Sequence, residues 1–230
     1  MNIHREKQKE IIQAIEEQLR TDSLQATAVA PVEDFENDNR ICLTSVHFPT
    51  QLFVDRILQT ITEPLKQSFP GAYSYPRDSL HFTIKNIRTI QNPPNFTEED
   101  VHNAIDLFGR VIPRHSSVTI YPYKLLLFKN NLALICTTDD TLDKLILDLD
   151  GQLRHAGIPD NKRYVNSRYF FCNMTLMRFT KLPPDGFFKQ VQELSAHLEL
   201  PDYRIDYVNL VTGNAAMKKL QIRGEWELKD

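Results

Sequence analysis

Two short apolar segments of this 230-residue chain carry polar side chains at matching positions. The first, SLHFTIKNIR at 79–88, contains His81 and Thr83, and the second, YFFCNMTLMRF at 169–179, contains Asn173 and Thr175. Side chains alternate across a strand, so each polar residue shares a face with the threonine two positions later, opposite an apolar face. A histidine can transfer protons near neutral pH, and hydroxyl groups can hydrogen-bond an anion. Two such strands facing one groove would form an acid–base and anion-binding site.

Either segment alone favours a structural role over a functional one. A strand histidine can be hydrogen-bonded for stability, and threonine is common in strands because its β-branched side chain packs well there. The pattern recurs after 173 − 81 = 92 residues, and both copies follow turn-like segments and lie in apolar runs. The pair of segments therefore favours a shared site.

Helices and strands alternate along the chain and must position the two segments. The sequence predicts helices at 3–20, 52–69, 97–112, 139–157 and 184–200, and strands at 41–48, 79–88, 117–128, 132–138, 167–179, 203–212 and 218–228. Thr97 and Asp100 resemble a capping box, and Gly157 can end its helix at positive φ. The tripeptide KNN at 129–131 predicts a tight hairpin, which excludes a purely parallel sheet. We therefore expect an α+β fold.

The first 39 residues differ in character from the rest. Residues 3–20 have apolar side chains at helical spacing in a charged background. The polar, acidic segment that follows has little periodicity, which indicates a linker or a loop across the body. We expect an N-terminal helix and linker at 1–39 and a compact two-lobed domain at 40–230.

The composition is that of an ordinary soluble protein, with 41% hydrophobic and 25% charged residues. A formal charge of −3 gives no global field for attracting polyanions. Cys42, Cys136 and Cys172 lie in separate apolar segments, which indicates buried thiols in a reducing compartment. No signal peptide is evident, and no segment approaches the roughly 18 apolar residues of a membrane helix. We expect a monomeric, cytoplasmic protein without membrane contact.

The motifs HFTI at 81–84 and NMTL at 173–176, with the order of elements over about 40–230, resemble the two-histidine phosphoesterase superfamily. This superfamily includes bacterial 2′-5′ RNA ligase-like proteins and cyclic phosphodiesterases, and each of its motifs is His-x-Thr or His-x-Ser followed by an apolar residue. The resemblance implies two pseudo-symmetric lobes of mostly antiparallel sheet, with outer helices, around a central cleft. The second motif departs from the pattern because Asn173 replaces the histidine.

In that family, two imidazoles cleave a phosphodiester, usually a 2′,3′-cyclic phosphate or a 2′-linked RNA bond. One imidazole removes a proton from the nucleophile and the other protonates the leaving oxygen, while the hydroxyls bind phosphate and no metal or other cofactor is needed. The resemblance assigns proton transfer to His81, phosphate binding to Thr83 and Thr175, and the second imidazole's place to Asn173. An amide cannot exchange a proton at neutral pH, although its NH₂ can hydrogen-bond phosphate.

Three interpretations of Asn173 are open. The chain could be a slower one-histidine phosphodiesterase acting on nucleotides or RNA ends, a non-catalytic nucleotide- or RNA-binding module, or an enzyme whose second proton donor comes from elsewhere. The intact first motif and second threonine favour an enzyme. Candidate substitutes for the missing proton donor are His115, His155, Tyr75 and Tyr207.

Further substrate contacts are expected from Lys85, Arg178 and Tyr75. Lys85 has the parity of His81, and relatives often carry a cation after the first motif. Arg178 corresponds to a cation after the second motif in the RNA ligase-like branch. Strict alternation turns Arg178 away from Asn173, so a β-bulge or a strand end is required to bring both into one groove. Tyr75 could stack on a base.

Overall fold

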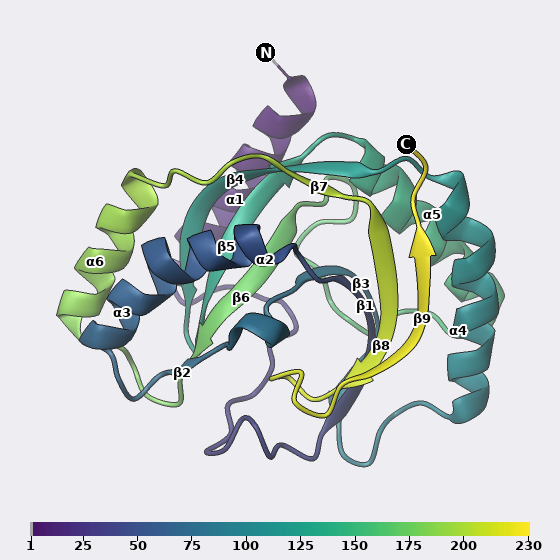
Figure 1. The fold of residues 1–230 in the computed structure, drawn as a ribbon, viewed down its shortest axis with the longest axis horizontal. Helices are drawn as coiled ribbons and strands as arrows, with labels where there is room; N and C mark the ends of the chain where they lie inside the picture. The colour runs from purple at the N-terminus through teal and green to yellow at the C-terminus, as the bar shows by residue number, and fades with distance from the viewer. Residues whose placement is uncertain (1) are drawn as a thin grey trace.

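A computed structural model describes residues 2–230 and confirms a two-lobed α+β fold with two sheets (Figure 1). All neighbouring strands in both sheets are antiparallel. The first sheet has the order β3-β1-β8-β9, with β1 at Ile41–His47, β3 at Phe82–Gln91, β8 at Tyr207–Gly213 and β9 at Gln221–Glu227. The second sheet has the order β2-β6-β5-β4-β7, with β2 at Tyr73–Ser74, β4 at Val118–Phe128, β5 at Asn131–Thr138, β6 at Cys172–Arg178 and β7 at Tyr203–Ile205.

The helices lie around the two sheets. Their bounds are α1 at Ile3–Arg20, α2 at Gln51–Ile57, α3 at Glu63–Ser68, α4 at Glu98–Val111, α5 at Thr141–His155 and α6 at Asp185–Ala196. The π-helical turn η1 (Leu58–Thr62) joins α2 to α3, so the predicted helix at 52–69 is present but not uniform. Helix α6 contacts α3 and β4, whereas α4 contacts α5 and β9, and Figure 1 shows these two helical groups on opposite sides of the molecule. No helix within residues 2–230 is long and apolar enough to cross a bilayer.

Local signals in the sequence correctly predicted several element ends. The backbone N–H of Asp100 donates to the Thr97 hydroxyl at 3.2 Å, and the Thr97 N–H donates to the Asp100 carboxylate at 2.8 Å, which completes the capping box of α4. Gly157 follows α5 with φ of 77°. The KNN tripeptide forms the predicted hairpin between β4 and β5.

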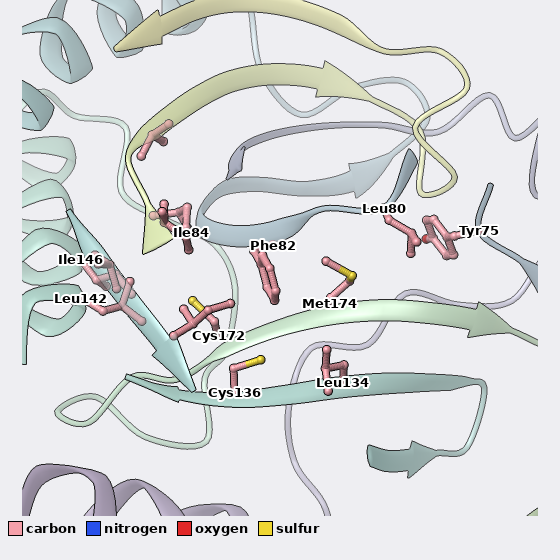
Figure 2. Close-up of a cluster of buried hydrophobic side chains, with 14 of the residues drawn as sticks. Tyr75, Leu80, Phe82, Ile84, Leu134, Cys136, Leu142, Ile146, Cys172 and Met174 are labelled. Carbon is pink, nitrogen blue, oxygen red and sulfur yellow. The ribbon is translucent and has the colours of Figure 1, made fainter. Parts of the chain in front are cut away.

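The apolar faces of the two motif segments belong to one hydrophobic core. Leu80, Phe82 and Ile84 from the first segment and Cys172 and Met174 from the second are at most 5% exposed and lie in the same cluster (Figure 2). This packing confirms the alternation expected around both motifs and requires the opposite faces of β3 and β6 to carry the polar residues.

Helix α1 packs on the polar side of the second sheet. Its Ile12 and Ile15 form a separate cluster with Ala133 and Ile135 of β5. Because Ala133 pairs with Thr175 and Ile135 pairs with Asn173, these β5 residues share the face of the second motif. The predicted helix at 3–20 is confirmed, and its apolar side covers part of the face that bears the motif.

Candidate active site

Matching β-bulges follow the threonines of the two motif strands. In β3, the register against β1 shifts directly after Thr83, and in β6 the register against β5 shifts directly after Thr175. Each shift inserts one extra residue and reverses the alternation beyond it. The residue that shares the threonine's face is therefore the third one along, which is Asn86 in β3 and Arg178 in β6.

Side chains from both strands line one cavity of about 270 Å³. Strand β3 contributes Thr83 and Asn86, and β6 contributes Asn173, Thr175 and Arg178. The bulge in β6 is the irregularity that the sequence required for Arg178 to join Asn173. The two predicted threonines, the asparagine and the arginine are therefore together at one site.

Two segments whose sequences show little periodicity complete the cavity wall. One is the N-terminal linker, which contributes Leu24 and residues 26–29, and the other is the loop between α5 and β6, which contributes Tyr164, Tyr169, Phe170 and Phe171 among others. The two segments are joined by hydrogen bonds from the Thr27 N–H to the Arg163 carbonyl at 3.1 Å and from the Arg163 N–H to the Thr27 hydroxyl at 2.8 Å. The linker is thus a structural wall of the cavity.

Most polar side chains that β3 and β6 contribute to the cavity are free of hydrogen bonds within the described part of the chain. Within residues 2–230, the side chains of Thr83, Asn86, Asn173 and Thr175 make no hydrogen bond to another protein group. Arg178 donates from Nε to the Tyr75 hydroxyl at 2.8 Å, and no carboxylate in the same part of the chain pairs with it. Free hydroxyls and amides beside an unpaired guanidinium suit an anion, since arginine and neutral donors together bind phosphate oxygens.

His81 lies directly before β3 as a buried, neutral imidazole. It is 8% exposed and is not among the residues that line the cavity. Its Nδ1 lies 2.7 Å from the Ser79 carbonyl oxygen, and because a carbonyl only accepts, Nδ1 carries the proton and Nε2 keeps its lone pair. Burial lowers the pKa of His81 to about 4; the Ser79 hydrogen bond opposes this shift and the positive charge of Arg178 adds to it.

Tyr75 connects Arg178 to the protein interior. The Tyr75 side chain is 1% exposed, and its hydroxyl donates to the Ala215 carbonyl while accepting from Arg178 Nε. The ring centres of Tyr75 and His81 are 6.3 Å apart. Burial raises the pKa of Tyr75, so its proton stays bound and engaged with Ala215. Tyr75 therefore supports the Arg178 guanidinium by a hydrogen bond, and Tyr75 itself does not line the cavity.

Lys85 does not reach the cavity, because the bulge after Thr83 turns it away. Its ammonium lies 2.7 Å from Asp160 and 3.1 Å from Asp150, and its side chain is 3% exposed. The Tyr164 hydroxyl also donates to Asp160. The parity expected for Lys85 is therefore wrong, and the structure places this residue in a buried ion pair.

The other titratable candidates lie outside the cavity. His115 is 2.9 Å from Asp148, His155 is exposed at the end of α5, and the Tyr207 hydroxyl donates to the Phe48 carbonyl at 2.6 Å. None of the three lines the cavity. In the described part of the chain, no group of three or more His, Cys, Asp or Glu side chains is arranged to hold a metal ion.

The sequence did not predict most of the cavity wall, and the unpredicted residues include the polar side chains of Asn86 and Lys162. Asn86 required the bulge after Thr83, for which the sequence offers no clear signal. Lys162 lies in the polar loop between α5 and β6, where no periodicity indicates the direction of a side chain.

The chain matches no protein-family model and no curated protein. Its fold is similar to solved structures. A phosphoesterase crystal structure aligns with 84% of this chain and 100% of its own at a TM-score of 0.55 and 15% identity. E. coli LigT complexed with phosphate gives the same coverage at a TM-score of 0.52 and 14% identity. The Agrobacterium tumefaciens protein ATU0111, of unknown function, aligns with 88% of this chain and 94% of its own at 0.61 and 10%. These similarities establish the fold.

Proposed function

We propose that this protein is a metal-independent phosphoesterase that cleaves 2′,3′-cyclic or 2′-5′ phosphodiesters of nucleotides or RNA ends. The observation that carries the proposal is the meeting of two threonine-bearing strands at one cavity, where Arg178 is unpaired and the polar side chains are uncommitted. In this proposal, residues 40–230 form the catalytic two-lobed domain, and Leu24 with residues 26–29 of the preceding segment closes one side of its cavity.

The reaction requires a base, an anion site and a proton donor for the leaving oxygen. His81 lies outside the cavity lining but beside Tyr75, which holds Arg178, and close enough to Arg178 for that charge to lower its pKa. In this proposal, His81 acts as the base through Nε2 and takes a proton from the attacking water. The hydroxyls of Thr83 and Thr175 donate to the non-bridging phosphate oxygens, and the Arg178 guanidinium offsets the charge that develops there. The Asn173 amide contributes a further hydrogen bond but no proton.

The nature of the substrate is supported by the cavity wall and by the structural neighbours. Aromatic side chains of the loop between α5 and β6, such as Tyr169 and Phe171, line the cavity and can stack on a base. LigT, which shares this fold, has crystal structures complexed with phosphate, ATP and 3′-AMP. We take nucleotide phosphates as the ligand class of this site on that combined basis.

The proposal predicts turnover of 2′,3′-cyclic AMP, or of a 2′-5′-linked dinucleotide, by the purified protein in EDTA. Thr83→Val and Thr175→Val preserve side-chain shape but remove one phosphate donor each, so each should lower kcat/KM by about 10²- to 10³-fold. Product formation is followed by chromatography. Thr89→Val is the matched control, because Thr89 lies on the same strand as Thr83 but outside the cavity.

Three results separate this function from its competitors. Binding of the nucleotide without any turnover would identify a non-catalytic binding module and reject the enzyme. Turnover that disappears in EDTA would reject the metal-independent mechanism. Unchanged kcat/KM in both valine variants at the motif threonines would show that phosphate is bound elsewhere.

A further inference from the structure

A phosphodiesterase reaction at this site still lacks a proton donor for the leaving oxygen. Asn173 occupies the position from which the second imidazole would act in the two-histidine pattern, and an amide cannot supply the proton. Tyr75 keeps its proton bound to Ala215, and the Tyr207 hydroxyl donates to the Phe48 carbonyl. His115 pairs with Asp148, and His155 is exposed at the end of α5. The donor must be sought among the remaining titratable groups of the cavity wall.

Lys162 is a titratable side chain in that wall. It is half-buried in the loop between α5 and β6 and lines the same cavity as Thr83 and Asn173. The loop is held on both sides of this residue: the Lys162 N–H donates to Asp160 at 2.6 Å, and the next residue, Arg163, exchanges hydrogen bonds with Thr27. These contacts fix the backbone from which the lysine side chain enters the cavity.

The Lys162 ammonium has no ion-pair partner. Among residues 2–230, no carboxylate oxygen lies within 4.0 Å of its nitrogen. The nearby carboxylate of Asp160 is already bound to the Lys85 ammonium and the Tyr164 hydroxyl. The Tyr164 ring centre lies 5.3 Å from the Lys162 nitrogen, which allows a weak cation–π contact but takes no proton.

The surroundings of Lys162 also favour release of its proton. Burial lowers its pKa, and the cations Lys85 of β3 and Arg178 of β6 lower it further. Asp160 of its own loop and the Cys42 thiol of β1 act in the opposite direction. A general acid is most effective when its pKa lies near the working pH, so a lowered lysine pKa suits this task.

We propose that Lys162 is the general acid that protonates the leaving oxygen, in the role left vacant by Asn173. The inference rests on the proposed phosphoesterase function. Water attacks phosphorus and gives one proton to His81 Nε2, the bond from phosphorus to the ribose oxygen breaks, and that oxygen takes a proton from the Lys162 ammonium. Solvent then removes the proton from the imidazolium and returns one to the amine, so the net reaction is hydrolysis of the diester.

The dependence of the rate on the leaving group tests this role in the 230-residue chain. Lys162→Met should lower kcat/KM for 2′,3′-cyclic UMP by about 10²- to 10⁴-fold, because the ribose alkoxide needs a proton to depart. With uridine 3′-(4-nitrophenyl phosphate), the leaving nitrophenolate needs none, so the loss should be at least roughly tenfold smaller. Lys162→Arg keeps the charge but gives up no proton, and should lose as much as Lys162→Met on the cyclic substrate.

Each other outcome overturns a specific part of the proposal. Equal losses on the two esters, or recovery of cyclic-substrate turnover by Lys162→Arg, would make Lys162 a phosphate-binding cation and reject the general acid. Absence of wild-type turnover on both esters would instead reject the underlying function. The control is Lys144→Met, because Lys144 of α5 forms an exposed ion pair with Asp140. Thermal melts of all variants separate loss of the proton donor from loss of the fold.

Discussion

His81→Ala is expected to lower kcat for phosphodiester hydrolysis by about 10²- to 10⁴-fold, with a much smaller change in nucleotide affinity. The imidazole is the only group assigned to remove the proton of the attacking water. The proposed anion-binding side chains are those of Thr83, Thr175 and Arg178, which line the cavity and are unchanged in the variant. Steady-state kinetics and calorimetric titration with a nucleoside monophosphate measure the two quantities separately.

The pH dependence of the wild-type protein tests the same assignment. The base acts in its neutral form, and because the pKa of His81 is lowered to about 4, the imidazole is already neutral at pH values above that. The acidic limb of kcat/KM should therefore fall near pH 4 instead of near the ordinary histidine value of about 6.5. Stability also decreases as the pH falls from about 6.5 towards 4, because the unfolded chain protonates His81 before the folded one does, so folding is monitored in parallel.

A matched control for the His81 variant is His115→Ala, since His115 pairs with Asp148 away from the cavity. We expect this control to retain wild-type turnover. Full activity of His81→Ala, or an acidic limb that stays near 6.5, would contradict the role of His81 as the base.

Lys85→Met is expected to lower the free energy of unfolding by about 3–5 kcal/mol, because it leaves a buried carboxylate without its cation. Asp160 is 4% exposed in its side chain and depends on the Lys85 ammonium at 2.7 Å. The second carboxylate, Asp150, is 24% exposed and also pairs with Arg154, so it is less affected. Urea denaturation followed by circular dichroism measures the change.

The double variant Lys85→Met with Asp160→Asn should recover part of this stability, since it removes the uncompensated charge as well. Lys144→Met removes one partner of an exposed pair and should cost no more than about 1 kcal/mol. If the Lys85→Met protein is as stable as wild type but binds nucleotide more weakly, Lys85 contacts the substrate, and its structural role is refuted.

The elements that position the site were predictable because their signals are local. Hydrophobic alternation identified both motif strands, and the threonine at position 97 and the glycine at 157 marked helix ends by their own chemistry. The pairing of strands that are distant in the sequence could not be predicted from these local signals. Strand β8, from near the chain's end, pairs with both β1 and β9, and β2 pairs with β6, so neither sheet is continuous in sequence.

The composition of the site was predictable only as far as strict alternation holds. Thr83, Asn173 and Thr175 lie before the bulges, where alternation holds, and they line the cavity. Beyond each bulge the pattern reverses, which excludes Lys85 from the wall. The bulges depend on pairing with β1 and β5, which are non-local partners, so a single strand's sequence does not determine them.

The N-terminal segment shows the same limit. The apolar spacing in 3–20 predicted the helix correctly, but amphipathicity says only that one side must be covered and not what covers it. The structure places Ile12 and Ile15 against β5 and residues 26–29 at the cavity. Lys162 was missed for a related reason, because loops carry no periodicity from which a side-chain direction can be predicted.

The decisive measurement is a crystal structure of the 230-residue chain with a bound nucleoside 3′-monophosphate. We expect a single phosphate between β3 and β6, within hydrogen-bonding distance of the hydroxyls of Thr83 and Thr175 and of the Arg178 guanidinium. A phosphate that contacts only one of the two strands, or that binds outside this cavity, would contradict this expectation.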